Sequence, residues 1–341
     1  MVRRLVLAWL SMLAAPAAAA ATPLFASDQP LRLALRGPIA EVLRGNQRDA
    51  QLALASPATE TLAVRLSPRG ITRRKSEICA FPPLRVELTQ KPAATSLFAR
   101  QRRLKLVTHC RREADFQQKV LLEYAAYRLF NLVTPASFRA RLAEIDYVDS
   151  AGRPVASRWG FFIEDVDDLA RRVGMREARV GDSVPASLLS PRESARYALF
   201  QYMIGNLDWS MRAGPKGAGC CHNSRLLSPR SGAGALVPVP YDFDFSGLVD
   251  APYATPPEGI PLRSVRTRRY RGLCAHDREA LVEAAALRAR RSEMIALFDV
   301  VPGLEPRTRR RATDYLGEFF DDIADDQRVT ARLLRTCVRQ N

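Results

Sequence analysis

The sequence predicts an α+β fold with strands concentrated in its first half and helices in its second. In segments such as 31–36 and 104–108, apolar and polar residues alternate, which is the period of a half-buried strand. Apolar residues recur at helical spacing over 192–204 and 277–298. The 341 residues can bury a substantial core, as one unit or as two small domains. We expect the strands to form a twisted antiparallel sheet.

The N-terminus is typical of an exported protein. Arg3 and Arg4 precede a short apolar run, and an alanine-rich tract continues to Ala21. This pattern predicts a signal peptide over residues 1–21, with an uncleaved membrane anchor as the alternative. No later stretch approaches the length of a membrane-spanning helix. We therefore expect an exported protein of the periplasm or the extracellular space.

Six cysteines in an exported chain favour disulfide bonds. We predict a bond between Cys79 and Cys110, because both lie beside predicted strands of the first half. The other four are expected to pair within the second half: Cys274 with Cys220 or Cys221, and Cys337 with the one that remains. A zinc site is disfavoured, because adjacent cysteines lack the usual two-residue gap and no second pair follows.

The net charge of +16 comes almost entirely from arginine and favours anionic partners. The arginine preference of a GC-rich coding sequence explains more than half of this excess. The charge is scattered, which argues against a nucleic-acid groove and leaves an anionic envelope surface as a possible partner. Dense clusters occur only at Arg263–Arg271 and Arg307–Arg311. The first either binds substrate anions or phosphates, or pairs with the acidic segment Glu318–Asp326.

Candidate catalytic residues are concentrated between residues 202 and 247. A helix ends just before Asp208 and places it on a loop, and a strand rich in Val and Pro later delivers Asp242 and Asp244. Asn223 lies between them in the sequence. Phosphoryl transfer needs one carboxylate to orient the nucleophile and further carboxylate and amide groups to hold a divalent metal. We therefore predict that Asp208 is the catalytic base and that Asn223 with Asp242 or Asp244 binds metal.

If the strand continues through them, the two carboxylates are expected to point in different directions, so that only one contacts metal. We favour Asp242, because it directly follows the strand. Asp244 would then bind a second metal or pair structurally with an arginine or lysine. For Asn223 the alternative role is to cap a turn. His222 is expected to be structural, since three histidines spread along the chain disfavour a histidine-based metal centre or hydrolase triad.

Six short motifs in this order resemble the CotH spore-coat kinases, a family of atypical secreted protein kinases. The resemblance covers about residues 65–320. It implies a two-lobed protein-kinase-like fold, with a β-rich N-terminal lobe at 22–164 and a mainly helical C-terminal lobe at 165–341. The motifs are Arg69–Arg73, Leu104–Cys110, Leu122–Tyr127, Gly160–Asp165, Gly205–Trp209 and Tyr241–Asp244.

The resemblance also implies roles for residues of the first half. Lys105 would contact nucleotide phosphates while paired with Glu123, as in kinases generally. Arg69 and Arg73 would lie near the phosphates, although a solvated hairpin explains them equally well. Glu164 would lie at the hinge between the lobes, where backbone groups bind adenine. Considered alone, Glu123 is more typical of an acid on a helix surface.

The function implied is transfer of phosphate from ATP, with Mg²⁺ or Mn²⁺, to a hydroxyl of a protein or small molecule. One departure from ordinary kinases is that the chain has no glycine-rich phosphate loop. One alternative is a catalytically silent relative that binds metal or ligand in the same cleft of an envelope protein. Another is a metal-dependent phosphoesterase, which the lack of a dedicated nucleophile and of histidine ligands disfavours.

Overall fold

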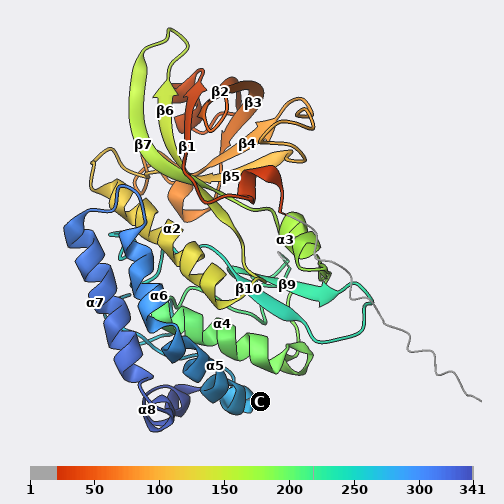
Figure 1. The fold of residues 1–341 in the computed structure, drawn as a ribbon, viewed down its shortest axis with the longest axis vertical. Helices are drawn as coiled ribbons and strands as arrows, with labels where there is room; N and C mark the ends of the chain where they lie inside the picture. Colours follow the sequence, from red (N-terminus) through yellow and green to blue (C-terminus); the bar gives the residue numbers. More distant parts are fainter. Residues whose placement is uncertain (1–20, 218, 340–341) are drawn as a thin grey trace, which may run out of the picture.

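The computed structural model describes residues 21–217 and 219–339. The predicted signal peptide therefore lies, except for Ala21, outside the described residues. A β-barrel occupies one end of the molecule and a group of helices occupies the other (Figure 1). Among the described residues, no helix is both long and apolar enough to cross a membrane.

Seven strands form the barrel in the order β1–β2–β3–β4–β5–β7–β6, and a separate three-stranded sheet has the order β10–β9–β8. Their bounds are β1 Leu31–Arg36, β2 Arg48–Ser56, β3 Glu60–Pro68, β4 Leu84–Leu88, β5 Arg103–Val107, β6 Ala140–Val148, β7 Pro154–Ile163, β8 Met175–Glu177, β9 Ser224–Pro229 and β10 Val237–Pro240.

The barrel closes because β1 pairs in parallel with β6, from Leu31 opposite Ala143 to Arg36 opposite Val148. The other pairs around the barrel are antiparallel. Alternate β1 residues point inward, and Leu31, Leu33 and Leu35 are all buried. Closure leaves no free sheet edge in the barrel.

The predicted fold class, a two-lobed protein-kinase-like α+β fold with an antiparallel sheet, is wrong. The strands form a closed mixed barrel instead. Apolar alternation shows that a strand has one buried face, but it does not specify which strand lies beside it. The parallel contact between β1 and β6 joins segments far apart in the sequence and has no local signature.

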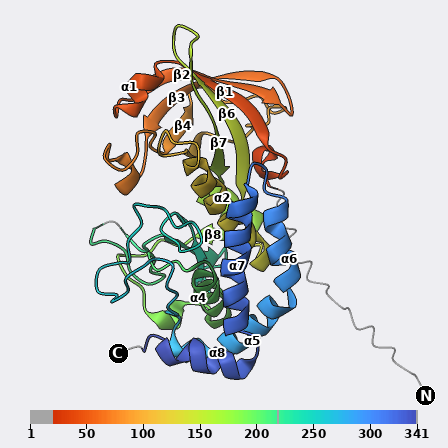
Figure 2. The same cartoon turned by 90° about the vertical axis from the view of Figure 1, so that its left-hand side faces the viewer.

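The helices follow or interrupt this barrel. Helix α2 lies directly below it, and α4 through α8 form most of the other end (Figures 1 and 2). Their bounds are α1 Ile39–Leu43, α2 Phe116–Val133, α3 Val166–Arg172, α4 Pro191–Ile204, α5 Asp277–Ala289, α6 Arg291–Ala296, α7 Pro306–Asp322 and α8 Asp326–Arg332.

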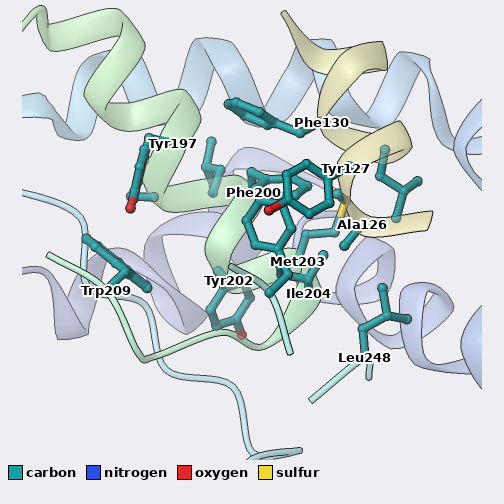
Figure 3. Close-up of a cluster of buried hydrophobic side chains, with 14 of the residues drawn as sticks. Ala126, Tyr127, Phe130, Tyr197, Phe200, Tyr202, Met203, Ile204, Trp209 and Leu248 are labelled. Carbon is teal, nitrogen blue, oxygen red and sulfur yellow. The ribbon is translucent and has the colours of Figure 1, made fainter. Parts of the chain in front are cut away.

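An aromatic core joins α2 and α4 (Figure 3). The ring centroids of Phe130 on α2 and Phe200 on α4 are 4.5 Å apart. Phe243, from the segment after β10, lies 4.6 Å from the ring of Tyr127 and 5.4 Å from that of Phe200. These contacts fix the segment that carries Asp242 and Asp244 against both helices.

The predicted disulfide between Cys79 and Cys110 is confirmed. The predicted partners of Cys274 are wrong, because Cys274 bonds to Cys337 and the adjacent residues Cys220 and Cys221 bond to each other. Cys337 reaches Cys274 because residues 272–274 and 338 exchange backbone hydrogen bonds. Three disulfides are consistent with an oxidising compartment.

Helix α4 ends at Gly205, whose φ of 64° is left-handed. A β-carbon at this position would collide with the hydroxyl of Tyr315 on α7. The glycine therefore permits both the turn into the Asp208 loop and the close packing of α7.

We expect Gly205→Ala to lower the free energy of unfolding by about 1–2 kcal/mol for the left-handed backbone and by about 1–3 kcal/mol more for the collision. Gly174→Ala is a matched control, because Gly174 has a φ of 71° and nothing lies within 4 Å of the place that an added β-carbon would occupy. Urea unfolding of both variants measures the difference. Equal losses would show that the contact with Tyr315 contributes nothing.

His109 is buried in the barrel against Phe81, with ring centroids 4.3 Å apart. Burial, with a smaller contribution from Arg158, lowers the pKa of His109 to about 4. Its Nδ1 atom has no hydrogen-bond partner among the described residues. The folded protein therefore holds this imidazole neutral at pH values where the unfolded chain protonates it.

Because the unfolded state binds the proton first, the stability contributed by neutral His109 is present above a pH of about 6.5 and is lost as the pH falls towards 4. Between pH 7 and pH 5 the loss is about 2 kcal/mol. Measured by urea unfolding, the free energy of unfolding of His109→Phe should fall between pH 7 and pH 5 by about 2 kcal/mol less than that of the wild type. An identical pH dependence in both proteins would contradict a neutral buried imidazole.

Candidate functional site

Three carboxylates meet where α2 faces the segment after β10. Glu123 comes from the middle of α2, and Asp242 and Asp244 follow β10. One oxygen of each lies within 4.8 Å of the others, and we call these three residues the carboxylate cluster. Glu123 and Asp244 are buried, whereas the side chain of Asp242 is 37% exposed. The cluster is therefore open to solvent on the side of Asp242.

Arg73 contacts all three carboxylates. Its Nη1 lies 3.0 Å from Oε2 of Glu123, its Nη2 lies 2.9 Å from Oδ1 of Asp242, and its Nε lies 3.2 Å from Oδ2 of Asp244. Arg73 belongs to the short 3₁₀ helix Thr72–Arg74 and is buried. One guanidinium can bind several carboxylates because it presents five N–H donors in a fixed plane.

The charges of the cluster do not balance. When all three carboxylates are ionised, as ligation of a metal requires, one guanidinium leaves two negative charges in a largely buried site. Oxygen ligands and a charge of minus two suit a divalent cation such as Mg²⁺ or Mn²⁺. The residues present therefore fit a metal ion, and Glu123, Asp242 and Asp244 would hold it.

The pKa values of the buried members reflect the same imbalance. Burial raises the pKa of Glu123, which the charge of Arg73 partly opposes, and burial raises the pKa of Asp244 well above its usual range. Burial disfavours the charge on Arg73, yet the carboxylates of Asp244 and Glu123 hold its pKa well above the ordinary value. Arg73 therefore stays protonated, and the carboxylate cluster favours the binding of additional positive charge.

Two tyrosines fix the cluster. The backbone N–H of Asp242 donates to the hydroxyl of Tyr127 at 3.0 Å, and the hydroxyl of Tyr253 donates to Oδ2 of Asp244 at 3.0 Å. Asp242 has a left-handed φ of 65°, which turns the chain directly after β10. Asp244 pairs with an arginine, as one of the two predicted roles allowed. The expected divergence of Asp242 and Asp244 is wrong, because both carboxylates contact Arg73.

Asp208 lies on the loop after α4 and is held by several donors. Its N–H donates to Oδ1 of Asn206 at 3.0 Å. The side-chain nitrogen of Asn223 donates to the Asp208 carbonyl at 2.7 Å and to Oδ2 at 3.0 Å. Nε2 of His222 lies 2.7 Å from Oδ1, and this hydrogen bond raises the pKa of His222. The Asp208 side chain is nevertheless 28% exposed.

The loop itself is anchored by Trp209 and Arg271. Nε1 of Trp209 donates to the carbonyl of Asn206 at 2.9 Å, and the Trp209 ring packs edge-on against Tyr197. Nη1 of Arg271 donates to the carbonyl of Leu207 at 2.7 Å, and its guanidinium lies over the Trp209 ring. Trp209 therefore packs the loop against α4.

A strand pair connects the Asp208 loop to the carboxylate cluster. Ser224 of β9 is opposite Pro240 of β10, and the N–H of Tyr241 donates to the carbonyl of Asn223 at 3.1 Å. Asn223 therefore contacts Asp208 through its side chain and adjoins the cluster segment through its backbone. Its role as a metal ligand remains a prediction, since the contacts described use its amide nitrogen.

Lys105, on β5, does not pair with Glu123, whose described ion pair is with Arg73. Its Nζ lies 6.0 Å from the centre of the Tyr241 ring. Burial lowers the pKa of Lys105, and the nearby charge of Arg69 adds to this effect. Lys105 and Arg69 thus form a separate positive region beside the cluster, on the barrel side.

Glu164 forms hydrogen bonds and an ion pair within the protein. It is fully buried, its carboxylate pairs with Arg172 at 2.9 Å, and it accepts a hydrogen bond from the N–H of Arg139 at 3.0 Å. Its own N–H donates to the carbonyl of Arg139. Its carboxylate and its N–H are therefore both paired within the protein, and a role of this segment in adenine binding remains a prediction.

Sequence reasoning missed the central position of Arg73 and placed Glu123 with the wrong partner. It also missed Tyr127 and Tyr253. A signal for part of the cluster was present, because Asp242 and Asp244 are only two residues apart and directly follow β10. Nothing local indicates that Arg73 reaches them.

Comparison with known proteins adds no assignment. No family model matches the chain, and no curated protein matches it.

We expect Arg73→Met to lower the free energy of unfolding by about 3–5 kcal/mol, because it leaves three carboxylates without their internal cation. Millimolar Mn²⁺ should restore more stability to this variant than it adds to the wild type. Urea unfolding with and without Mn²⁺ measures both effects.

Arg172→Met is the matched control, because it also removes a buried arginine but leaves only one carboxylate, that of Glu164. We expect this variant to be destabilised without recovery in Mn²⁺. Equal recovery of both variants would show that the metal acts elsewhere than at the carboxylate cluster.

Proposed function

We propose that this protein is a metal-dependent phosphotransferase that moves a phosphoryl group from a nucleotide to a hydroxyl. The observation that carries the proposal is the position of Asp208. It is oriented by Asn223 and His222, remains partly exposed, and is connected through β9 and β10 to three carboxylates suited to a divalent cation. Positioning and charge neutralisation supply most of the catalysis in phosphoryl transfer.

Each group has a role that matches its surroundings. Asp208 orients the acceptor hydroxyl, since both of its oxygens are fixed by hydrogen bonds. Each oxygen keeps a second lone pair, through which the carboxylate accepts the proton of the hydroxyl. A cation held by the carboxylate cluster would neutralise charge on the phosphates. Lys105 and Arg69 provide positive charge for the phosphates from the barrel side.

The proposed donor is ATP with Mg²⁺ or Mn²⁺, and the proposed acceptor is a protein or small-molecule hydroxyl. The three disulfides support export to the periplasm or the extracellular space. An acceptor in that compartment would have to reach Asp208, which is accessible from solvent.

A second candidate is an envelope protein that binds metal or ligand at this site without catalysis. The observation that favours it is Arg73, which already supplies one cation to all three carboxylates. In this case the cluster is primarily a structural junction, and any metal strengthens it.

Thermal unfolding with ATP, measured with and without Mn²⁺, separates the two candidates. For a phosphotransferase we expect ATP and Mn²⁺ together to raise the melting temperature by a few degrees. Asp242→Ala should abolish the shift, because it removes the exposed ligand of the cluster. Asp146→Ala, an exposed aspartate on β6, is the control and should keep the shift.

Asp208→Asn then tests transfer itself. We expect it to retain the ATP shift and to slow transfer of the ATP γ-phosphate to water or an acceptor by about 100-fold or more. A wild type that responds to Mn²⁺ but not to ATP supports the non-catalytic candidate. The absence of any response to either ligand would refute both.

A further inference from the structure

A second site is suggested by a cavity of about 390 Å³ between α2, the segment 248–252 and the start of α7. The N-terminal ends of α2 and α7 both lie on the side nearer the barrel (Figures 1 and 2). The charged residues lining the cavity are Lys119, Arg266, Arg307 and Arg311, which are basic, and Asp115, Asp250 and Glu305, which are acidic.

Basic groups outnumber acidic groups in this lining by four to three. Nζ of Lys119 donates to the carbonyls of Val249 at 3.0 Å and Asp250 at 2.7 Å. The carboxylate of Asp250 lies 3.1 Å from Arg311 and 3.8 Å from Arg266. The carboxylate of Asp250 therefore pairs with both arginines, whereas Lys119 is held by backbone carbonyls.

The pKa of Lys119 is lowered, chiefly by burial. The charges of Arg311 and Arg266 lower it further, and Asp250 and Asp115 oppose this effect. A lysine held beside two arginines favours an additional anion, which would relieve the repulsion among them. Arg268, which belongs to the basic cluster Arg263–Arg271, lies outside this cavity and pairs with Glu318. Pairing with the acidic segment Glu318–Asp326 is one of the two roles that the sequence predicted for this cluster.

The start of α7 adds to this positive potential. The N-cap residue is Glu305, whose side chain makes no capping hydrogen bond, and no acid occupies the first turn. Arg307 lies in the first turn, where the helix dipole favours negative charge, and Arg311 lies one turn further along the same helix, so a further anion is favoured beside them. The walls are fixed in place, because Gln118 of α2 donates to the carbonyl of Gly303 at 2.9 Å and accepts from the N–H of Glu305 at 3.0 Å.

We propose that this cavity binds a phosphate group of a small soluble molecule, between Lys119, Arg266, Arg311 and the N-terminus of α7. Arginines and helix N-termini recognise phosphate through charge-assisted hydrogen bonds, and Arg266 and Arg311 each have more N–H donors than Asp250 can use. The proposal does not depend on the proposed phosphotransfer, since none of these residues belongs to the Asp208 loop or the carboxylate cluster.

Isothermal titration of the protein with inorganic phosphate, at constant ionic strength, tests this site. We expect Arg311→Glu to weaken binding by about tenfold or more, because it reverses a charge in the lining. Arg310→Glu is the matched control: it makes the same charge change at an exposed position of α7 outside the cavity lining. Equal weakening by both variants would show a response to net charge alone and would overturn the proposal.

Two further measurements locate and identify the ligand. Lys105→Ala separates this cavity from the positive region that is proposed to contact nucleotide phosphates. Phosphate binding that persists in Lys105→Ala and is weakened in Arg311→Glu belongs to the cavity, whereas binding that is lost only in Lys105→Ala would overturn the assignment. Vesicles containing phosphatidic acid test a lipid source. Binding to these vesicles that depends on Arg311, without binding of free phosphate, would contradict a small soluble ligand.

Discussion

The contact of Arg73 with three carboxylates is the interaction on which the arrangement of the site depends. It joins a short helix after β3, the middle of α2 and the segment after β10. A buried charge without a partner is very unfavourable, so these three parts of the chain must meet in one geometry. The barrel and the helical part are thereby connected by a polar contact as well as by apolar packing.

The segment Asp242–Asp244 shows how apolar and polar requirements act together. Phe243 is fully buried among Tyr127 and Phe200, and the two aspartates that flank it reach Arg73. Packing of the Phe243 ring determines how deeply the segment is buried, and the ion pairs with Arg73 determine where its carboxylates point. The carboxylates of the candidate metal site are held here by the same core that stabilises α2 against α4.

The loop carrying Asp208 is built differently, mostly from contacts close in sequence. Gly205 ends the helix, Asn206 accepts from the N–H of Asp208, and Trp209 closes back onto the carbonyl of Asn206. Such short-range contacts have sequence signals, which is why the loop and its exposed acid were predictable. The partners His222 and Asn223 arrive from a distant segment, and their contacts with Asp208 were not foreseen.

The sequence by itself determined the elements that depend on local periodicity: the strands of the first half, the helices α2 and α4, the loop at Asp208 and, from its strand-flanking cysteines, the bond between Cys79 and Cys110. Only the tertiary structure decided that β1 closes a barrel by pairing with β6, that Glu123 meets Arg73 rather than Lys105, and that Cys274 bonds to Cys337. The physical reason is that periodicity specifies which face of an element is buried, whereas many partners satisfy the same buried face. The choice among them depends on packing and charge balance across segments distant in the chain.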